Sequence, residues 1–553
     1  MNFDLLPYSH ETLRTCLLDD SDYSIADGAQ GRGHTLYFQQ YLDELKAETI
    51  LVENHYVDRD YLQDYAEYYD RCFSDYPRRT HRLHFFSCVI SLKVFEDAVT
   101  STPGSPSTAM LQDNYLGFIV VKPLPQTIIG RTCLKTYGAD GGRRNFPCLR
   151  AYPVNLYGIE LDVLSLAYQE QDQVVAACAT SALWSCFQGT GKLFQHSIPA
   201  PVEITKWATV QMPDNLLTAG ARAFPNNGLT AKQMAHAISR VELESHIIRA
   251  SSRYNLNSAV YAYLKGRIPS LLSVQLARLG EFGLQTVGGH AVSVIGYSLR
   301  EDSDYEYSQP GFKLRAAKID KLYVHDDQVG PFCRLEWGEL PSPQQMFDEG
   351  VEQLVALKTS WDDSIYHIPD FVLLPLYHKI RIPFSLIHDS MVVLNSLMDV
   401  WRAEVEGADS EALEWDIFLT TVNEYKTSIR DEYSGLGVDF RKCLYARLPR
   451  FLWRVSVRRQ GAIQMDFLFD ATGVAQHSLL VNVFSVDCSD KEILTAMAGA
   501  EFQSELRQVP LQVRSVINAF AATEVVENPE DAQSSEPLIT PEAIVSPSAP
   551  EHQ

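Results

Sequence analysis

The sequence predicts an α+β protein, and three observations lead to that fold class. The chain has 553 residues, which at roughly 100–200 residues per domain predicts about three domains. Hydrophobic residues make up 46% of the chain, enough to build packed cores. Stretches with helical spacing alternate with strand-like runs that are rich in aromatic and β-branched residues.

Residues 1–155 are expected to form an N-terminal α+β domain. Residues 38–76 have helical spacing, so we expect helix there. Residues 82–90 and 114–125 are strand-like, and prolines stop the second run. No residue of this domain is assigned a chemical role.

Residues 341–522 are expected to form a C-terminal α+β domain, followed by a disordered acidic tail over 523–553. The tail is rich in Pro, Glu and Ser and has too little apolar content to pack. The domain shows two expected helices, three stretches of expected strand and one segment of short strands or loop broken by proline. The expected helices cover residues 385–405 and 415–433. The expected strands cover residues 450–459, 460–473 and 477–487, and the segment broken by proline covers residues 367–384.

Charge and cysteine usage restrict the functions that the chain can have. A formal net charge of −23 argues against nucleic acid as a main partner and against anionic membranes, and it favours a basic protein or peptide. The ten cysteines form no CxxC pair and no zinc-ligand pattern, so we expect reduced thiols and no metal. No signal peptide and no apolar run of about 18 residues is present, so we expect a cytoplasmic protein.

The central domain, expected over residues 156–340, contains a cysteine where a polar segment passes into a helix-like run. The segment reads QDQVVAACATSALWSCF and starts at Gln171. A helix N-terminus stabilises a thiolate, and its free N–H groups can bind an oxyanion. Cys178 is therefore a candidate nucleophile, and a packing role is the alternative.

A candidate base follows in GGHAVSVIGY, which covers residues 288–297. After two glycines, His290 precedes an alternating apolar run, so we expect it at the mouth of a buried strand. The glycines allow the backbone to pass close to a substrate. Residues 266–276 are the expected neighbouring strand.

Two further sets of polar side chains can complete such a site. Asp326 and Asp327 end the strand-like run KLYVH, and a carboxylate there can accept the Nδ1–H of His290 or cap a turn. Gln171 and Gln173 precede Cys178, and an amide there can donate to an oxyanion or remain solvated.

The stretches around Cys178, His290 and Asp326 together resemble papain-like cysteine peptidases, most of all the bacteriocin-processing (double-glycine leader) branch. The resemblance covers about residues 160–335, and HAVSVIGY is its most specific part. It implies a helix with the cysteine packed on an antiparallel sheet that carries His and Asp. It also implies a triad of Cys178, His290 and Asp326, with Asp327 as second choice and no cofactor.

The chain departs from that family at two places. The oxyanion glutamine often lies six residues before the cysteine, where this chain has Asp172 flanked by Gln171 and Gln173. A glycine commonly follows the nucleophile, where this chain reads CATSALW. The expected function is cleavage of a peptide or isopeptide bond in a protein substrate through a thioester. The alternatives are acyl transfer of the transglutaminase type on the same triad and a non-catalytic protein-binding module.

Overall fold

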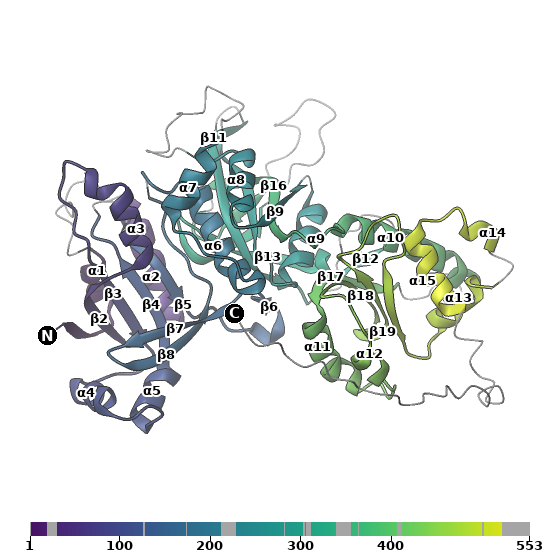
Figure 1. Ribbon diagram of the computed structural model, residues 1–553, viewed down its shortest axis with the longest axis horizontal. Coiled ribbons are helices and arrows are strands. Elements are labelled where there is room, and N and C mark those ends of the chain that lie inside the picture. The colour runs from purple at the N-terminus through teal and green to yellow at the C-terminus, as the bar shows by residue number, and fades with distance from the viewer. Residues whose placement is uncertain are drawn as a thin grey trace, which may run out of the picture.

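The computed structural model describes most of the chain and shows mixed helix and strand throughout, which confirms the α+β class. The described residues are 2–18, 30–124, 128–172, 174–211, 228–250, 252–280, 283–301, 305, 311–338, 356–362, 364–405, 412–499 and 503–521. The expected tail and Gln173 lie outside these ranges. Figure 1 shows three regions in a row, from the N-terminal region at the left to the C-terminal region at the right.

The N-terminal region is a five-stranded antiparallel sheet with helices around it. The strands follow chain order: β1 (Phe3–Pro7), β2 (Thr49–Tyr56), β3 (Thr80–Phe86), β4 (Tyr115–Val121) and β5 (Ile129–Leu134). Its helices are α1 (His10–Leu18), α2 (Gln30–Glu44), α3 (Arg59–Glu67), α4 (Leu92–Thr100) and α5 (Pro106–Asn114). Every residue of β4 is buried, as expected for an apolar run between two neighbouring strands.

The central region is built on an antiparallel sheet that closes on itself. The order is β10-β11-β13-β14-β15-β16, and β16 pairs back with β10, so six strands form a closed cycle. These strands are β10 (Ser270–Gly280), β11 (Gly283–Leu299), β13 (Ile319–Asp326), β14 (Gly330–Trp337), β15 (Leu357–Thr359) and β16 (Ile365–Tyr377). Two strands add to the outside, β9 (Leu243–Arg249) on β16 and β6 (Arg144–Asn145) on β11.

Helix α6 (Cys178–Phe194) packs on this sheet and contacts β10, β11, β13 and β16. It is buried along most of its length, including Leu183, Trp184 and Phe187, and each such side chain contributes roughly 1.5–3 kcal/mol. Gly189 permits this close packing, because a Cβ there would lie 2.9 Å from Pro269 Cγ. The other helices of the region are α7 (Pro201–Thr209), α8 (Ala231–Ser239) and α9 (Arg253–Leu264).

The C-terminal region is a second α+β sheet, with strand order β12-β17-β18-β19-β20. The strands are β12 (Lys313–Leu314), β17 (Glu414–Thr421), β18 (Phe451–Arg459), β19 (Ala462–Asp470) and β20 (Leu480–Ser485). Its helices are α10 (Phe384–Val405), α11 (Val422–Ser434), α12 (Arg441–Tyr445), α13 (Ser489–Met497), α14 (Gln503–Leu506) and α15 (Leu511–Ala521). The expected helix over 385–405 and the expected strands over 450–487 are confirmed.

Strand pairing crosses both expected domain boundaries. The hairpin of β7 (Arg150–Leu156) and β8 (Ile159–Ser165) lies across the boundary at residue 155, and its apolar side chains share one core with Leu183 and Phe86. β15 and β16 lie beyond residue 340 and yet close the central sheet. The prolines in 367–384 suggested a broken segment, but Pro369 lies where the register with β10 shifts, a place that tolerates proline.

Two expected helical stretches contain strands. Residues 38–76 include β2 between α2 and α3, and residues 415–433 begin with most of β17 before α11. Both strands pair with partners distant in the chain, so tertiary pairing overrides the local helical spacing.

Candidate active site

Cys178 is the first residue of α6, which makes its position different from that of a core cysteine. Residues 174–177, which precede the helix, form a turn held by Asp172. The Asp172 carboxylate accepts hydrogen bonds from the amides of Val174 and Val175 and from the Tyr69 hydroxyl. The helix therefore begins at the thiol.

The first turn of α6 leaves amide groups available beside the thiol. Ala177, the N-cap residue, has no side-chain hydrogen bond to the helix, and the first bond inside the turn is from Thr180 N–H to Ala177 C=O. The amides of Cys178 and Ala179 precede that bond. Helix N-terminal amides of this kind stabilise a thiolate and can bind an oxyanion.

The expected glutamines have a less defined place. Gln171 is half-buried at the start of the loop that leads to Cys178, and Gln173 lies outside the described residues. Asp172, between them, is only 4% exposed and has a structural role, because its oxygens bind the loop amides and Tyr69. No sequence pattern separated this aspartate from its glutamine neighbours.

His290 lies on β11 opposite Val274 of β10, and Asp326 is the last residue of β13. The register pairs Ser293 with His325, so the next residue, Asp326, lies diagonally across from His290 on the same face of the sheet. His290 Nε2 is 2.9 Å from Asp326 Oδ1, and both side chains are at most 2% exposed. The sequence correctly expected these two residues to meet.

The nitrogen that faces Asp326 is Nε2, which corrects the expectation of an Nδ1 contact. The diagonal placement brings the far end of the ring to the carboxylate. Nδ1 is buried and makes no hydrogen bond within the part of the chain that the structure describes. The Cys178 thiol lies within hydrogen-bonding reach of the ring and contributes to raising its pKa.

Opposite charges stabilise the charged forms of His290 and Asp326. Burial alone would lower the pKa of His290, but Asp326, by its charge and hydrogen bond, holds that pKa well above its ordinary value. Burial alone would raise the pKa of Asp326, but the His290 charge and hydrogen bond lower it to about 2. Each side chain of the pair therefore stabilises the charged form of the other.

Asp327 lies next to this pair and behaves differently. Its Oδ1 is 3.9 Å from His290 Nε2, beyond hydrogen-bonding distance. Its Oδ2 is buried and has no hydrogen-bond partner among the described residues. Burial, together with the charge of Asp326 and against that of His290, raises the pKa of Asp327 to about 7. The structure thus separates the two candidate aspartates, since only Asp326 hydrogen bonds to the ring.

The turn with both aspartates is supported by the N-terminal region. His34 on α2 donates from Nε2 to the Asp327 carbonyl at 3.0 Å, and its Nδ1 is 3.5 Å from Glu170. The Tyr37 hydroxyl donates to the Pro331 carbonyl, and its ring fills the space beside Gly330, where a Cβ would lie 2.3 Å from the ring. These contacts join positions almost 300 residues apart, so local sequence gave no sign of them.

His367 on β16 is a further residue that the sequence did not identify. Its ring centroid lies 6.4 Å from that of His290, and its side chain is buried. Burial lowers the pKa of His367, although the charge of Asp326 opposes the shift. A neutral imidazole therefore lines the centre from the strand that closes the sheet.

Seven of the other nine cysteines have surroundings that disfavour the thiolate. Burial raises the pKa of seven thiols, those of Cys88, Cys133, Cys148, Cys186, Cys333, Cys443 and Cys488. A raised thiol pKa suppresses the reactive thiolate near neutral pH. Differences in thiol reactivity can therefore report on Cys178.

Within the described residues, one group of side chains has ligand atoms close enough for a metal ion. It consists of His290, Asp326 and Asp327, whose ligand atoms lie within 4.8 Å of one another. An ion there would replace the hydrogen bond between His290 and Asp326. It would occupy Nε2, the ring nitrogen whose bond to Asp326 orients the imidazole. Metal binding and a Cys–His–Asp arrangement are therefore mutually exclusive at this centre.

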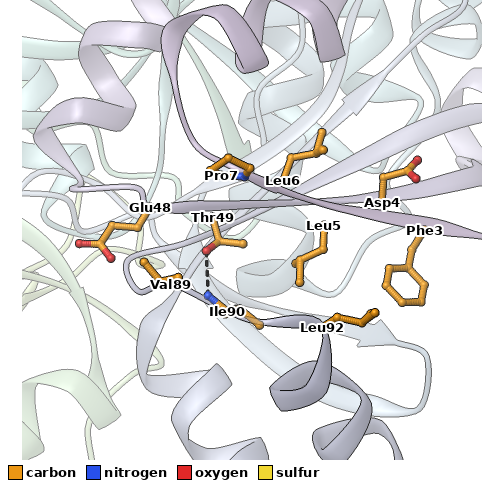
Figure 2. A pocket seen from close by; sticks show the side chains of 10 residues that line it. All are labelled: Phe3, Asp4, Leu5, Leu6, Pro7, Glu48, Thr49, Val89, Ile90 and Leu92. Atoms are coloured by element: carbon orange, nitrogen blue, oxygen red, sulfur yellow. Dashed lines mark hydrogen bonds between the residues drawn. The ribbon is translucent and has the colours of Figure 1, made fainter.

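A separate cavity of about 440 Å³ lies beside the edge strand β1 of the N-terminal sheet (Figure 2). Leu5, Ile90 and Leu92 line it together with two acidic side chains, Asp4 and Glu48. Its lining contains no cysteine and no histidine. The candidate nucleophile and base, Cys178 and His290, lie instead at the central sheet.

Comparison with known proteins adds no family to this geometry: no protein-family model matches the chain, and no curated protein is significantly similar to it. Among the helices of the described ranges, none combines the length and apolar character needed to cross a membrane.

Proposed function

We propose that this protein is a papain-like cysteine peptidase that cleaves a peptide or isopeptide bond in a protein substrate. The observation that carries the proposal is that the two ring nitrogens of His290 have different surroundings. Nε2 is hydrogen bonded to Asp326, while Nδ1 makes no other hydrogen bond among the described residues and the Cys178 thiol lies within reach of the ring. A base oriented in this way is what an activated thiol requires.

The first half of the reaction forms a thioester. His290 Nδ1 takes the thiol proton, and the Cys178 thiolate attacks the substrate carbonyl carbon. The oxyanion accepts hydrogen bonds from the Cys178 amide and from Gln171 or Gln173. The carbon–nitrogen bond then breaks, and the Nδ1 proton passes to the leaving amine.

The second half releases the acid. His290 Nδ1 takes a proton from water, and the resulting hydroxide attacks the thioester carbonyl. The carbon–sulfur bond breaks and the thiolate leaves, after which the proton on Nδ1 returns to the sulfur. Asp326 keeps the ring oriented through both halves and stabilises the imidazolium in each.

The test is brief treatment with iodoacetamide near neutral pH, read by mass spectrometry of the whole protein and of its peptides. We expect rapid, single-site modification of Cys178 in the wild type, none at that rate in His290→Ala, and none in Cys178→Ser. Reaction at Cys178 no faster than at the other cysteines would contradict the proposal. With a substrate in hand, product analysis with and without added amine separates hydrolysis from acyl transfer.

A further inference from the structure

The proposed reaction leaves one buried carboxylate of the centre, that of Asp327, without a role. The Asp327 side chain is 3% exposed, and its Oδ2 accepts no hydrogen bond from the described residues. A buried carboxylate oxygen without a donor destabilises a fold, so a native structure is expected to supply a partner for it. A bound cation is one such partner.

The end of β13 brings two consecutive carboxylates to one imidazole ring. Consecutive residues inside a strand point to opposite faces. Asp326 ends β13, however, and Asp327 begins the turn that returns the chain to Gly330 of β14. The Oδ1 atoms of Asp326 and Asp327 therefore lie 2.9 Å and 3.9 Å from His290 Nε2. The ligand atoms of the three side chains are within 4.8 Å of one another.

These distances suit a tetrahedral zinc ion. Zinc bonds to nitrogen and oxygen of about 2.0–2.2 Å place neighbouring ligand atoms about 3.3–3.6 Å apart. The two distances from Nε2 lie on either side of that range, so small side-chain rotations would bring both carboxylates to bonding distance. Mg²⁺ and Ca²⁺ take about six to eight oxygen ligands, so a ring nitrogen with two carboxylates favours zinc.

The charges of the centre also favour a divalent cation. Among the described residues, Asp326 and Asp327 form ion pairs with His290 and with no Lys or Arg. Two carboxylates thus share a single basic ring in a buried centre. A Zn²⁺ ion bound to both carboxylates and to a neutral ring would balance their two negative charges.

We infer that a zinc ion binds His290 Nε2 and both carboxylates, and that it reversibly switches off the Cys178 thiol. The effect on the thiol rests on the proposed function. Zinc takes the Nε2 lone pair, so a neutral ring carries its proton on Nδ1. Nδ1 then has no lone pair free to take the thiol proton. The ion also replaces the bond to Asp326 that orients the ring.

The first test measures zinc binding to Cys178→Ser, because this variant keeps the three ligands and lacks the thiol. Calorimetric titration with zinc chloride should show a site that is lost, or at least about tenfold weaker, when Asp327→Asn is added to that variant. Asp439→Asn, which removes an exposed carboxylate of the C-terminal region, is the matched control and should leave the affinity unchanged.

The second test measures the effect of the ion on the thiol. At a zinc concentration that saturates the site, iodoacetamide labelling of Cys178 in otherwise unaltered protein should slow by at least about tenfold, and EDTA should restore it. In Asp327→Asn the same zinc concentration should slow labelling by less than about twofold. An ion held by Cys178 and His290 alone would instead slow both proteins equally.

The two tests separate this inference from the proposed function. Rapid labelling in EDTA, with no zinc site in Cys178→Ser or with a site that Asp327→Asn leaves intact, would overturn the inference and leave the thiol centre in place. A zinc site that does not change the labelling rate would overturn the switch. Slow labelling in EDTA would overturn the proposed function, and with it the effect of zinc on the thiol.

Discussion

Two regions of the molecule bury a basic side chain against carboxylates, and the regions differ in whether all the buried polar atoms are hydrogen bonded. In the C-terminal sheet, every guanidinium nitrogen of Arg454 and both carboxylate oxygens of Asp466 make hydrogen bonds. In the central sheet, His290 Nδ1 and Asp327 Oδ2 are buried without a hydrogen-bond partner in the described part of the chain. Both clusters lie on antiparallel strands, so the sheet type does not cause the difference.

Under the proposed function, this difference distinguishes the fully bonded Arg454–Asp466 pair from a centre whose open atoms take part in a reaction. An unsatisfied buried polar group costs about 1–3 kcal/mol, so a purely structural cluster is expected to satisfy all its atoms. An atom left open beside a thiol is where a proton can be taken up or released. The predictions below test whether the two clusters can be altered independently.

The largest expected effect is on stability and comes from Arg454→Met. The variant leaves Asp466 buried with no cation bonded to it, and we expect unfolding to require about 3–5 kcal/mol less free energy in urea titrations. Labelling of Cys178 in the folded variant should match the wild type. Lys491→Met, which removes the exposed pair with Asp487, is the control and should have no measurable effect. A large loss of thiol reactivity in Arg454→Met would contradict the separation.

For Asp326→Asn we expect the opposite of Arg454→Met, namely a change in the labelling of Cys178 as the main effect. The amide keeps the shape of the side chain but removes the charge that holds the His290 pKa high, so His290 becomes a weaker acceptor for the thiol proton. We expect the labelling rate at pH 7 to fall by about tenfold or more, with a shifted pH profile. The urea midpoint of Arg454→Met and the pH profile of Asp326→Asn thus report on different clusters. An unshifted profile would mean that Asp326 does not act on the thiol.

The sequence was sufficient where chemistry and local pattern coincide. HAVSVIGY alternates as a strand and identified His290, and Asp326 follows from the end of the next strand in the sheet. The sequence failed at the start of β11, which begins at Gly283 rather than at His290. The glycines and polar residues of GLQTVGG carry a weak strand signal, and their pairing with β10 forms the strand.

The remaining parts of the centre depend on contacts between distant residues. His34 and His367 reach it from the N-terminal helix α2 and from β16, in units that the sequence placed in other domains. Closure of the sheet through β16 cannot be deduced from the spacing of residues 365–377. Asp172 could not be distinguished from a solvated residue, because its role depends on Tyr69 and on two amides of its own loop.

Asp327→Asn should change the pH dependence of stability, because the Asp327 carboxyl is buried with Oδ2 unbonded among the described residues. In the folded protein its pKa is about 7, above the value of about 3.9 in an unfolded chain, so the folded state binds the extra proton. Its contribution to stability is therefore fully present below about pH 4 and is lost as the pH rises through about 7. Asp326 has the opposite sign, because its lowered pKa makes its contribution disappear only toward pH 2.

The expected result is a variant that gains stability over the wild type as the pH rises. Between pH 5 and pH 8 the difference in unfolding free energy should change by about 1–3 kcal/mol in favour of Asp327→Asn. Thermal unfolding at fixed ionic strength measures it. Asp439→Asn is the comparison and should show no such trend in this range, because the hydrogen bond from Arg441 lowers the pKa of the Asp439 carboxyl to about 2. A flat difference for Asp327→Asn would indicate an ionised Asp327 throughout.

The smallest effect concerns His34, through which the N-terminal region supports the turn of the two aspartates. His34→Ala removes the shorter of two hydrogen bonds to the Asp327 carbonyl and leaves only the one from the Tyr168 hydroxyl at 3.5 Å, a loss of about 1 kcal/mol of unfolding free energy. Because the turn also holds Asp326, we expect a few-fold slower labelling of Cys178 with no change in the reactivity of unfolded thiols. His34→Gln, which can still donate, should restore part of both. If His34→Ala lowers stability but leaves the labelling rate and its pH profile unchanged, the N-terminal region stabilises the fold without positioning the base.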